Sequence, residues 1–547
     1  MKKRFTPILG LLLMLCVQSQ AQSFESATDA VKNMGVGWNL GNTLDAVKEG
    51  VAEGWTWDSI EDHEKNWGQP VTTPELMKMM KEAGFGAIRV PVTWYQEMDS
   101  EGKVNDAWMN RVKEVVDYVI DNDMYCIINV HHDTGDGTQW LHASTTTYDK
   151  VKDKYEYLWK QIAEKFKDYD QHLLFESYNE MLDDNNRWNE PASDDGYKAI
   201  NSYAKLFVTT VRNTGGNNAE RNLVVNDYSA SSAPNAMKAL ELPEESGHII
   251  FQLHSYPNWQ TKSNAKNEID NLISNIKSNL LDRAPVIIGE YATFTTWPST
   301  IDYYDKDKEV ALYAMDYLIK ETKKEGIGTF YWMGLSDRIY RSEPAFNQAD
   351  LAETLIKAYY GDDFEGQYPE AEIPVGGVVF EGEKQLEWGD AIEILPESFA
   401  ELDSNCTLEV TYKLNFAHFD EDAQYGMMQF WYNDWSEMIN INAEGKTFNG
   451  DFVPLDVYGG DSGPEYKTVF SFDEATFNNI KKKGLLFQGH GLIVYKAELF
   501  SDGAPQTGIK SIKADGKDAP IYNLAGQRVT NPTKGIYIKN GKKFIVK

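Results

Sequence analysis

Two glutamates carry the clearest chemical signal in the sequence. Glu180 follows the apolar run at residues 173–175, and Glu290 follows the run at residues 286–288. A carboxylate at the exit of a buried strand is costly unless it is used. Two of them at one end of a barrel can serve as proton donor and nucleophile on a single glycosidic bond. The sequence therefore predicts a retaining glycosidase with this catalytic pair.

A cation is predicted beside one of these acids. Arg89 lies in the otherwise apolar strand Ile88–Val92, where a guanidinium is tolerated only next to a carboxylate. Glu290 is the natural partner, and the arginine would keep it ionised by lowering its pKa. The alternative is a structural ion pair beneath the barrel.

Polar residues also follow the third and fourth apolar runs. Adjacent residues on a strand point to opposite faces, so only one of His131 and His132 is expected to face the sugar, and we favour His131. A metal site or a solvated loop is the alternative for this pair. Asn179 directly precedes Glu180 and is suited to a hydrogen bond with the sugar 2-hydroxyl, which strengthens in the transition state.

The sixth and eighth runs end in groups that suit a sugar. A hydroxyl on Tyr256 can hold the nucleophile, and His254 can contact the acid/base or the substrate. The indole of Trp332 suits the apolar face of a pyranose. Core packing is the alternative for these residues. Further candidate cleft aromatics are Trp38, Trp94, Trp140 and Trp259.

These residues must be positioned by a repeating scaffold. From Met34 to about Tyr360, apolar runs of strand length alternate with amphipathic segments of helix length, and eight such βα units favour a (β/α)8 TIM barrel over residues 22–360. The predicted strands are Val36–Leu40, Ala87–Val92, Tyr125–Val130, Leu173–Ser177, Asn222–Asn226, Ile249–Leu253, Pro285–Ile288 and Thr329–Met333.

Helices are predicted from apolar positions three and four residues apart. One begins with Thr73 as N-cap and Pro74 at the first helical position, and Gly84 ends it. The others are expected over Trp108–Ile120, Tyr155–Phe166, Tyr203–Val211 and Ala311–Ile319.

The residue pattern changes after the predicted barrel. Residues 361–374 are acidic with Gly and Pro and predict a linker, and residues 375–503 give short alternating runs that predict a smaller β-sandwich. Alternation puts Trp431 and Trp435 on one face, which is either a polysaccharide-binding platform or the core. Residues 504–547 form a basic, β-type tail that is too short for a core of its own.

The N-terminus predicts export. Residues 1–21 combine a basic start, an apolar stretch and a small-residue end, as a signal peptide does, so we expect a secreted protein, extracellular or at the cell surface. Leu15 precedes Cys16 where a small residue would be expected, which weighs against a lipid anchor. No later segment approaches the roughly 20 apolar residues of a membrane span.

The composition and charge of the chain exclude some classes of binding partner. With 547 residues and 42% apolar content, two or three folding units are expected. The formal net charge of -31 argues against nucleic acid and leaves a neutral polymer compatible. Cys126 and Cys406 lie far apart in different segments, so a disulfide framework is not available. We expect a monomer that needs no cofactor.

Taken together and in order, seven motifs resemble the endoglucanases of glycoside hydrolase family 5. They are Gly37–Thr43, Ile88–Trp94, His131-His132, Asn179-Glu180, His254–Tyr256, Ile288–Glu290 and Tyr331-Trp332. The resemblance implies hydrolysis of internal β-1,4-glucosidic bonds in cellulose-type β-glucans with retention and no metal. It places Glu180 as acid/base and Glu290 as nucleophile, with substrate-binding roles for Arg89, His131, Asn179, His254, Tyr256 and Trp332.

Other functions on the same scaffold stay open. The opening Asn39–Asp45 looks like the subgroup that also accepts xyloglucan and mixed-linkage glucan, so a xyloglucanase or a lichenase is an alternative, as is a β-mannanase. A non-catalytic glycan-binding protein would be expected to lack one of the two glutamates. The basic tail resembles the sorting tails with which Bacteroidetes-type bacteria export proteins.

Overall fold

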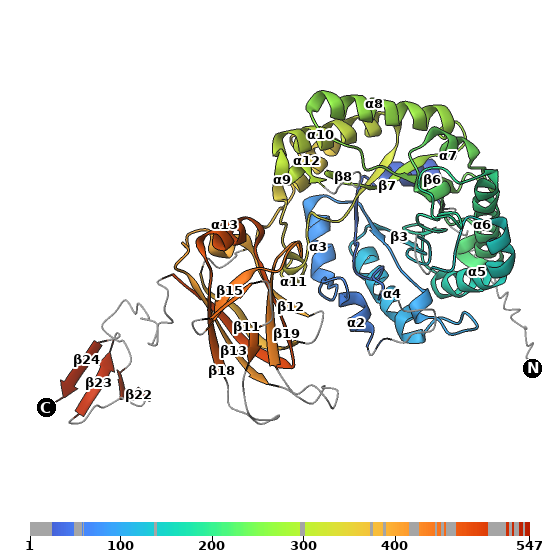
Figure 1. The fold of residues 1–547 in the computed structure, drawn as a ribbon. Helices are drawn as coiled ribbons and strands as arrows, with labels where there is room; N and C mark the ends of the chain where they lie inside the picture. Colours follow the sequence, from blue (N-terminus) through green and yellow to red (C-terminus); the bar gives the residue numbers. More distant parts are fainter. Residues whose placement is uncertain are drawn as a thin grey trace, which may run out of the picture. The chain divides into compact units, whose positions relative to one another are not determined.

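A computed structural model gives the architecture of the chain (Figure 1). It divides into two compact units, Met1–Ala371 and Glu372–Lys547, so the boundary falls inside the predicted linker. The residues that the structure describes are 24–48, 57, 59–135, 139–295, 301–371, 376–386, 390–414, 426–443, 446–449, 453–455 and 466–501, with the tail strands 521–523, 528–529, 535–539 and 542–546.

The first unit is a closed barrel of eight parallel strands, which confirms the predicted fold. Its strands follow one another around the barrel in the order β1-β10-β7-β6-β5-β4-β3-β2. They are β1 (Val36–Asn39), β2 (Ala87–Val90), β3 (Tyr125–Asn129), β4 (Leu173–Glu176), β5 (Leu223–Asn226), β6 (Ile249–His254), β7 (Val286–Tyr291) and β10 (Gly328–Tyr331). A two-stranded ribbon, β8 (Phe294–Thr295) with β9 (Ile301–Asp302), follows β7.

Helices surround the strands, as Figure 1 shows. The predicted helix after Thr73 is α3, and Gly84 ends it with a φ of 111°, a conformation that favours glycine. Thr73 is the N-cap residue and Pro74 begins the helix, as predicted, although the Thr73 hydroxyl makes no capping hydrogen bond. The helices of this unit are α1 (Ala27–Asn33), α2 (Ile60–Lys65), α3 (Pro74–Ala83), α4 (Asp106–Ile120), α5 (Thr145–Phe166), α6 (Asp194–Asn213), α7 (Pro234–Ala239), α8 (Lys262–Asn279), α9 (Tyr303–Lys306), α10 (Lys308–Glu325), α11 (Ile339–Ser342) and α12 (Ala349–Tyr360).

The barrel interior is layered. Successive strand residues alternate between the interior and the helices, and one apolar interior layer includes Ala87, Ile127, Leu174, Val224 and Ile250. Two residues further along the same strands the interior turns polar. We call this second layer the polar belt; it consists of Asn39, Arg89, Asn129, Glu176, Asn226 and Gln252, all buried.

Strand β7 carries one extra residue at the level of this belt. Leu253 pairs with Ile288, but His254 pairs with Glu290, and the pairing with β10 shifts over the same stretch. Such a bulge reverses which side chains point inward. Ile287 faces the barrel interior, whereas Tyr291 packs outside against the helices. The bulge at Gly289 therefore turns Glu290 into the interior.

The second unit contains two antiparallel sheets packed face to face around one core, as the sequence predicts. One sheet has the order β11-β20-β13-β18-β15-β16 and the other β12-β19-β14-β17. Their strands are β11 (Gly377–Leu386), β12 (Ala391–Ile394), β13 (Thr407–Leu414), β14 (Gly426–Tyr432), β15 (Asn440–Ala443), β16 (Lys446–Asn449), β17 (Val453–Leu455), β18 (Tyr466–Ser471), β19 (Leu485–His490) and β20 (Leu492–Phe500).

The second unit also contains a helix that the sequence pattern did not reveal, and a tail of the predicted β type. The helix α13 (Glu474–Lys483) buries only Thr476, Phe477 and Ile480, so its apolar face is too narrow to stand out. The tail forms a small antiparallel sheet in the order β22-β21-β23-β24, from β21 (Ile521–Asn523), β22 (Arg528–Val529), β23 (Gly535–Lys539) and β24 (Lys542–Val546).

Two predictions about export lie partly outside these observations. Residues 1–21, the predicted signal peptide, are not among the described residues. Among the helices that the structure describes, none combines the length and apolar character needed to cross a bilayer.

Candidate active site

Three side chains meet where β4, β6 and β7 end. One ligand atom each of Glu180, His254 and Glu290 lies within 4.8 Å of the other two. The Nδ1 atom of His254 is 2.7 Å from a Glu180 oxygen and 3.5 Å from a Glu290 oxygen, so this imidazole bridges the two acids. The two carboxylates thus lie as close as those of a retaining glycosidase.

The two acids differ in environment. The side chain of Glu290 is 6% exposed and that of Glu180 is 23% exposed. Glu290 accepts a hydrogen bond from Arg89 Nη1 at 2.8 Å and another from the Tyr256 hydroxyl at 2.7 Å. Two donors, one of them charged, favour the ionised carboxylate. A buried, ionised acid beside a more accessible one is the asymmetry that separates a nucleophile from a proton carrier.

The pKa of Glu290 departs from the sequence prediction. Burial raises it above the ordinary value of a glutamate, although His254 and Arg89 act in the opposite direction. The expectation that the arginine would lower it outright is therefore wrong, because the depth of the site could not be judged from the sequence. The same burial lowers the pKa of His254 to about 4 and keeps that imidazole neutral at pH 7.

Arg89 is bonded along its whole guanidinium. Besides Glu290, it donates two hydrogen bonds to Glu176, at 2.6 and 2.8 Å, one to Asn39 and one to Asn179. Burial disfavours the charged guanidinium, but the two carboxylates outweigh burial and raise the pKa of Arg89 above its ordinary value. Because the amide oxygen of Asn179 accepts from Arg89, its amide nitrogen is turned away from the arginine.

Glu176 is the main residue that the sequence analysis missed. It is buried at the end of β4 and accepts hydrogen bonds from Arg89, Asn129 and Asn226, all members of the polar belt. Burial opposes its ionisation, but the charge and hydrogen bonds of Arg89 hold the pKa of Glu176 below its ordinary value. The available signal was a charged residue inside the predicted strand Leu173–Ser177, the same anomaly that identified Arg89.

The two histidines after β3 correct a second expectation. Strand β3 ends at Asn129, so strand alternation does not apply to His131 and His132, whose rings lie 4.5 Å apart. Both have ring nitrogens within 4.8 Å of each other and of a carboxylate oxygen of Asp45. His131 is buried and His132 is partly exposed. The two imidazoles therefore lie side by side, and the choice of His131 as the ring that faces the sugar stays a prediction.

Asn129 fixes the proton on His131. Its amide oxygen accepts from the backbone of Val92, so its amide nitrogen is the group that faces Nδ1 of His131 at 3.0 Å. Nδ1 is therefore the acceptor and Nε2 carries the hydrogen. Burial lowers the pKa of His131 well below its ordinary value, which keeps the ring neutral.

Trp332 stands in the cleft rather than in the core. Its ring is partly exposed and parallel to the His131 ring, with centroids 5.9 Å apart. Gly41 allows this position, since a Cβ there would lie 2.8 Å from the indole. Of the further tryptophans proposed for the cleft, Trp38, Trp94 and Trp259 are buried and so offer no face to a sugar, while Trp140 is partly exposed.

Two groups of side chains in the described chain have the composition of a cation site. One is the catalytic group around His254, and the other is Asp45 with the two histidines. The oxygens of Asp45 already accept from the backbone of Asn42 and Thr43, at 3.0 and 2.8 Å. The absence of a metal requirement stays a prediction.

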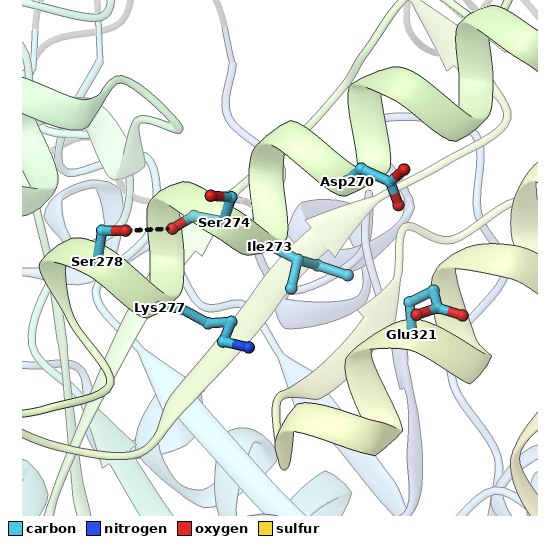
Figure 2. A pocket seen from close by; sticks show the side chains of 6 residues that line it. All are labelled: Asp270, Ile273, Ser274, Lys277, Ser278 and Glu321. Carbon is cyan, nitrogen blue, oxygen red and sulfur yellow. Dashed lines mark hydrogen bonds between the residues drawn. The ribbon is translucent and has the colours of Figure 1, made fainter.

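A surface hollow of about 270 Å³ lies elsewhere, between α8 and α10 (Figure 2). Its charged residues are engaged by neighbours, as Lys277 pairs with Glu325, Asp270 with Lys266, and Glu321 with Lys324. Charges neutralised in this way on a helix surface have structural roles and leave no reactive group for a substrate.

Comparisons with known proteins agree with this geometry. Residues 44–336 match the sequence model of the cellulase family, glycosyl hydrolase family 5. Endoglucanase A of Clostridium longisporum is 34% identical over 374 residues, which cover 63% of this chain and 68% of that protein. Endoglucanase A of Ruminococcus albus is 35% identical over 325 residues, which cover 56% of this chain and 83% of that protein.

Solved structures resemble the first unit. A GH5-4 broad specificity endoglucanase from an uncultured bacterium is 51% identical, with a TM-score of 0.59 over 62% of this chain and 98% of that one. A family 5 enzyme from Prevotella bryantii, solved with a xyloglucan tetradecasaccharide, is 40% identical, with a TM-score of 0.58 over 61% of this chain and 99% of that one. The family match covers more than half of the chain and coincides with the barrel that brings Glu180 and Glu290 together. The chain belongs to the cellulase family, glycosyl hydrolase family 5, and is an endoglucanase-type glycoside hydrolase.

Proposed function

We propose that the protein is a secreted endo-acting enzyme that cleaves internal β-1,4-glucosidic bonds of cellulose-type β-glucans with retention. The observation that carries this proposal is the distance of at most 4.8 Å between carboxylate oxygens of Glu180 and Glu290. Retaining enzymes place their acids about 5 Å apart, whereas inverting enzymes leave about 6.5–9.5 Å for a water molecule.

The first step forms a glycosyl-enzyme. A Glu290 oxygen attacks the anomeric carbon while the bond from that carbon to the leaving oxygen breaks, and Glu180 gives its proton to the leaving oxygen. The contacts of Glu290 with Arg89 and Tyr256 suit a nucleophile that must be ionised and fixed. The greater exposure of Glu180 suits a group that exchanges protons with water.

The second step releases the sugar. Glu180, now ionised, takes a proton from water, the water oxygen bonds to the anomeric carbon, and the bond to Glu290 breaks. The neutral ring of His254 lies 2.7 Å from Glu180 and keeps that carboxyl in place through both steps. Its other nitrogen, Nε2, is buried without a hydrogen-bond partner among the described residues, and a sugar hydroxyl would satisfy it.

Three further residues would bind the sugar at the cleavage point. Arg89 orients Asn179 so that its amide nitrogen is available for the 2-hydroxyl. His131 has its hydrogen on Nε2, directed away from Asn129, and so can donate to a hydroxyl. Trp332 offers an indole face to the pyranose ring.

Substitution of each acid tests the mechanism. Glu180→Ala should still cleave aryl glycosides whose leaving group needs no proton, and azide should accelerate it and give a β-glycosyl azide. Glu290→Ala should lose activity by roughly 10⁴-fold or more, as removal of a nucleophile does in other enzymes, and azide should then give the α-glycosyl azide. Exchanged products would reverse the two roles. Unaltered activity in both variants would refute the catalytic assignment and favour a glycan-binding barrel.

The polymer is a separate question. The Prevotella bryantii enzyme was solved with xyloglucan, another solved chain is described as an endo-β-mannanase/endo-β-glucanase, and several are described as broad specificity endoglucanases. A xyloglucanase, lichenase or β-mannanase on this scaffold would use the same acids. We expect the highest rate on β-1,4-glucans in a panel of carboxymethylcellulose, barley β-glucan, xyloglucan, mannan and xylan, measured as released reducing ends. A preference for mannan or xylan would contradict the glucan assignment.

Export remains part of the proposal because it rests on residues 1–21 and on the basic tail. Expression in a host that secretes proteins should give an extracellular chain whose N-terminal sequence begins near Gln22. A chain that keeps Met1 and stays inside the cell would contradict it. Deleting residues 504–547 should reduce export if the tail is a sorting signal.

A further inference from the structure

An aromatic pair lies on the outer face of the four-stranded sheet of the second unit. Along β14, Met428, Phe430 and Tyr432 point into the sandwich core, so Trp431 points to the opposite face. The Trp435 ring lies beside it, with centroids 5.7 Å apart. Alternation along a strand does not explain the pair, because β14 ends at Tyr432 and a turn brings Trp435 back.

The fold gains little from Trp435. Its side chain is 40% exposed, and its backbone has a φ of 57°, the left-handed region that a bulky residue rarely adopts. An exposed indole and an unfavourable backbone both count against stability. Such costs are retained where a surface binds something.

Two amides and one apolar side chain, all buried, lie beside the pair. The Gln488 amide oxygen accepts from the Trp431 indole nitrogen at 3.1 Å and fixes the ring. Gln429 lies opposite Gln488, and Leu486 lies opposite Trp431, on the neighbouring strand β19. A fixed indole face matches the apolar ring face of a sugar. Fixing the ring in advance also lowers the entropy cost of binding.

We propose that this face, formed by Trp431 and Trp435 and held in place by the buried Gln488, is a binding site for a neutral β-glucan chain. The net charge of -31 disfavours anionic polymers and anionic lipid surfaces, which leaves a neutral polysaccharide as the occupant. The choice of β-glucan rests on the proposed function of the barrel. The site would hold the enzyme on its polymer without taking part in cleavage.

Affinity electrophoresis of the full chain tests this site. A Glu290→Gln background prevents hydrolysis, and all variants then share one cleft, so differences in retardation by barley β-glucan report the second unit alone. Trp431→Ala/Trp435→Ala should weaken binding about tenfold, the effect expected for loss of aromatic anchors. Tyr495→Ala is the control, because Tyr495 lies on β20 in the other sheet and also loses a partly buried aromatic ring. Equal effects of the control and the double variant would overturn the proposal.

A glycine variant separates binding from folding. Trp435→Gly removes the ring and suits the left-handed backbone, so its thermal unfolding midpoint should match or exceed that of the parent while binding falls. Unchanged binding in this variant would overturn the proposal. In the Glu290-containing parent, the same substitution should leave hydrolysis of a soluble aryl cellobioside unchanged. If that hydrolysis is absent from the parent, the proposed function fails, and retardation that depends on Trp435 would still support the binding face.

Discussion

Arg89 and Arg221, two of the fully buried arginines of the barrel unit, differ in their partners. Arg89, near the end of β2, donates to two carboxylates and two amides. Arg221, just before the start of β5, donates to Asn218 and to four backbone carbonyls between Phe166 and Leu173. One guanidinium therefore joins side chains that can react, and the other ties down the end of α5.

The two arginines also differ in how strongly their surroundings favour the charged guanidinium. The carboxylates raise the pKa of Arg89 above its ordinary value, whereas burial lowers the pKa of Arg221 to about 9. Carbonyl oxygens at a helix C-terminus carry partial negative charge and stabilise a cation less than a carboxylate does. A buried cation thus marks a reaction site only when its partners are themselves reactive, which is why Arg89 was informative and Arg221 is structural.

The largest expected effect separates these two residues. Arg89→Lys should lower kcat/KM by roughly 10²–10³-fold, because a lysine cannot bond Glu176, Glu290 and Asn179 together and each lost charged hydrogen bond costs about 1.5–3 kcal/mol. Arg221→Lys should lower the thermal unfolding midpoint and leave kcat/KM within about twofold. Kinetics on a soluble β-glucan and thermal unfolding followed by circular dichroism measure both. A loss of kcat in Arg221→Lys without a loss of stability would break the comparison.

Glu176→Gln should have the next largest effect. With one counter-charge removed, Arg89 acts more strongly on Glu290, so the pKa of Glu290 should fall and the acidic limb of kcat/KM should move to lower pH. The rate should fall about ten- to a hundredfold as the guanidinium loses its alignment. Glu244→Gln is the matched control, since it breaks a pair with Arg212 outside the site. A pH profile that does not move would limit Glu176 to a structural role.

Tyr256→Phe should shift the same limb in the opposite direction. The phenol donates to Glu290 and favours its ionised form, so its removal should raise the pKa of Glu290 and move the acidic limb to higher pH by about one unit. Tyr331→Phe, which loses a hydroxyl bonded to Thr293, is the control. Shifts of the same sign in Glu176→Gln and Tyr256→Phe would contradict the proposed arrangement.

Removal of divalent metal ions is expected to have no effect. Activity on soluble β-glucan should be unchanged in EDTA, because every assigned role is met by a side chain. Loss of activity that a divalent ion restores would show that one of the two groups around His254 or Asp45 binds a required cation.

Much of the barrel could be predicted because strands buried on both faces are continuous apolar runs. The predicted ends of the eight barrel strands, β1 to β7 and β10, agree with the structure to within a few residues. Polar residues beyond the runs, such as Glu180 and His254, were easy to recognise. Glu176 and Asn129 were assigned to predicted strands and not recognised as site residues, because a single polar residue does not interrupt an apolar pattern.

The burial of the site residues and the directions of their side chains could not be predicted from the sequence. The raised pKa of Glu290 depends on how far it is buried, and the closeness of His131 and His132 depends on where β3 ends. In the second unit, alternation gave the outward direction of Trp431 only once the core residues of β14 were known. Sequence patterns therefore predict which residues share a helix or strand better than they predict which side chains are in contact.

The bulge in β7 makes the direction of the nucleophile depend on the backbone of its strand as well as on the residue type. Deleting Gly289 would restore regular pairing with β6 and leave Glu290 opposite His254 and inside the barrel, whereas a regular strand that kept Gly289 would turn Glu290 toward the helices. An added methyl at Gly289 would itself collide with Gln252, only 2.4 Å away. A relative that retains both glutamates and Gly289 but pairs this strand regularly would therefore be an inactive barrel, so the bulge is as necessary to the enzyme as the two acids.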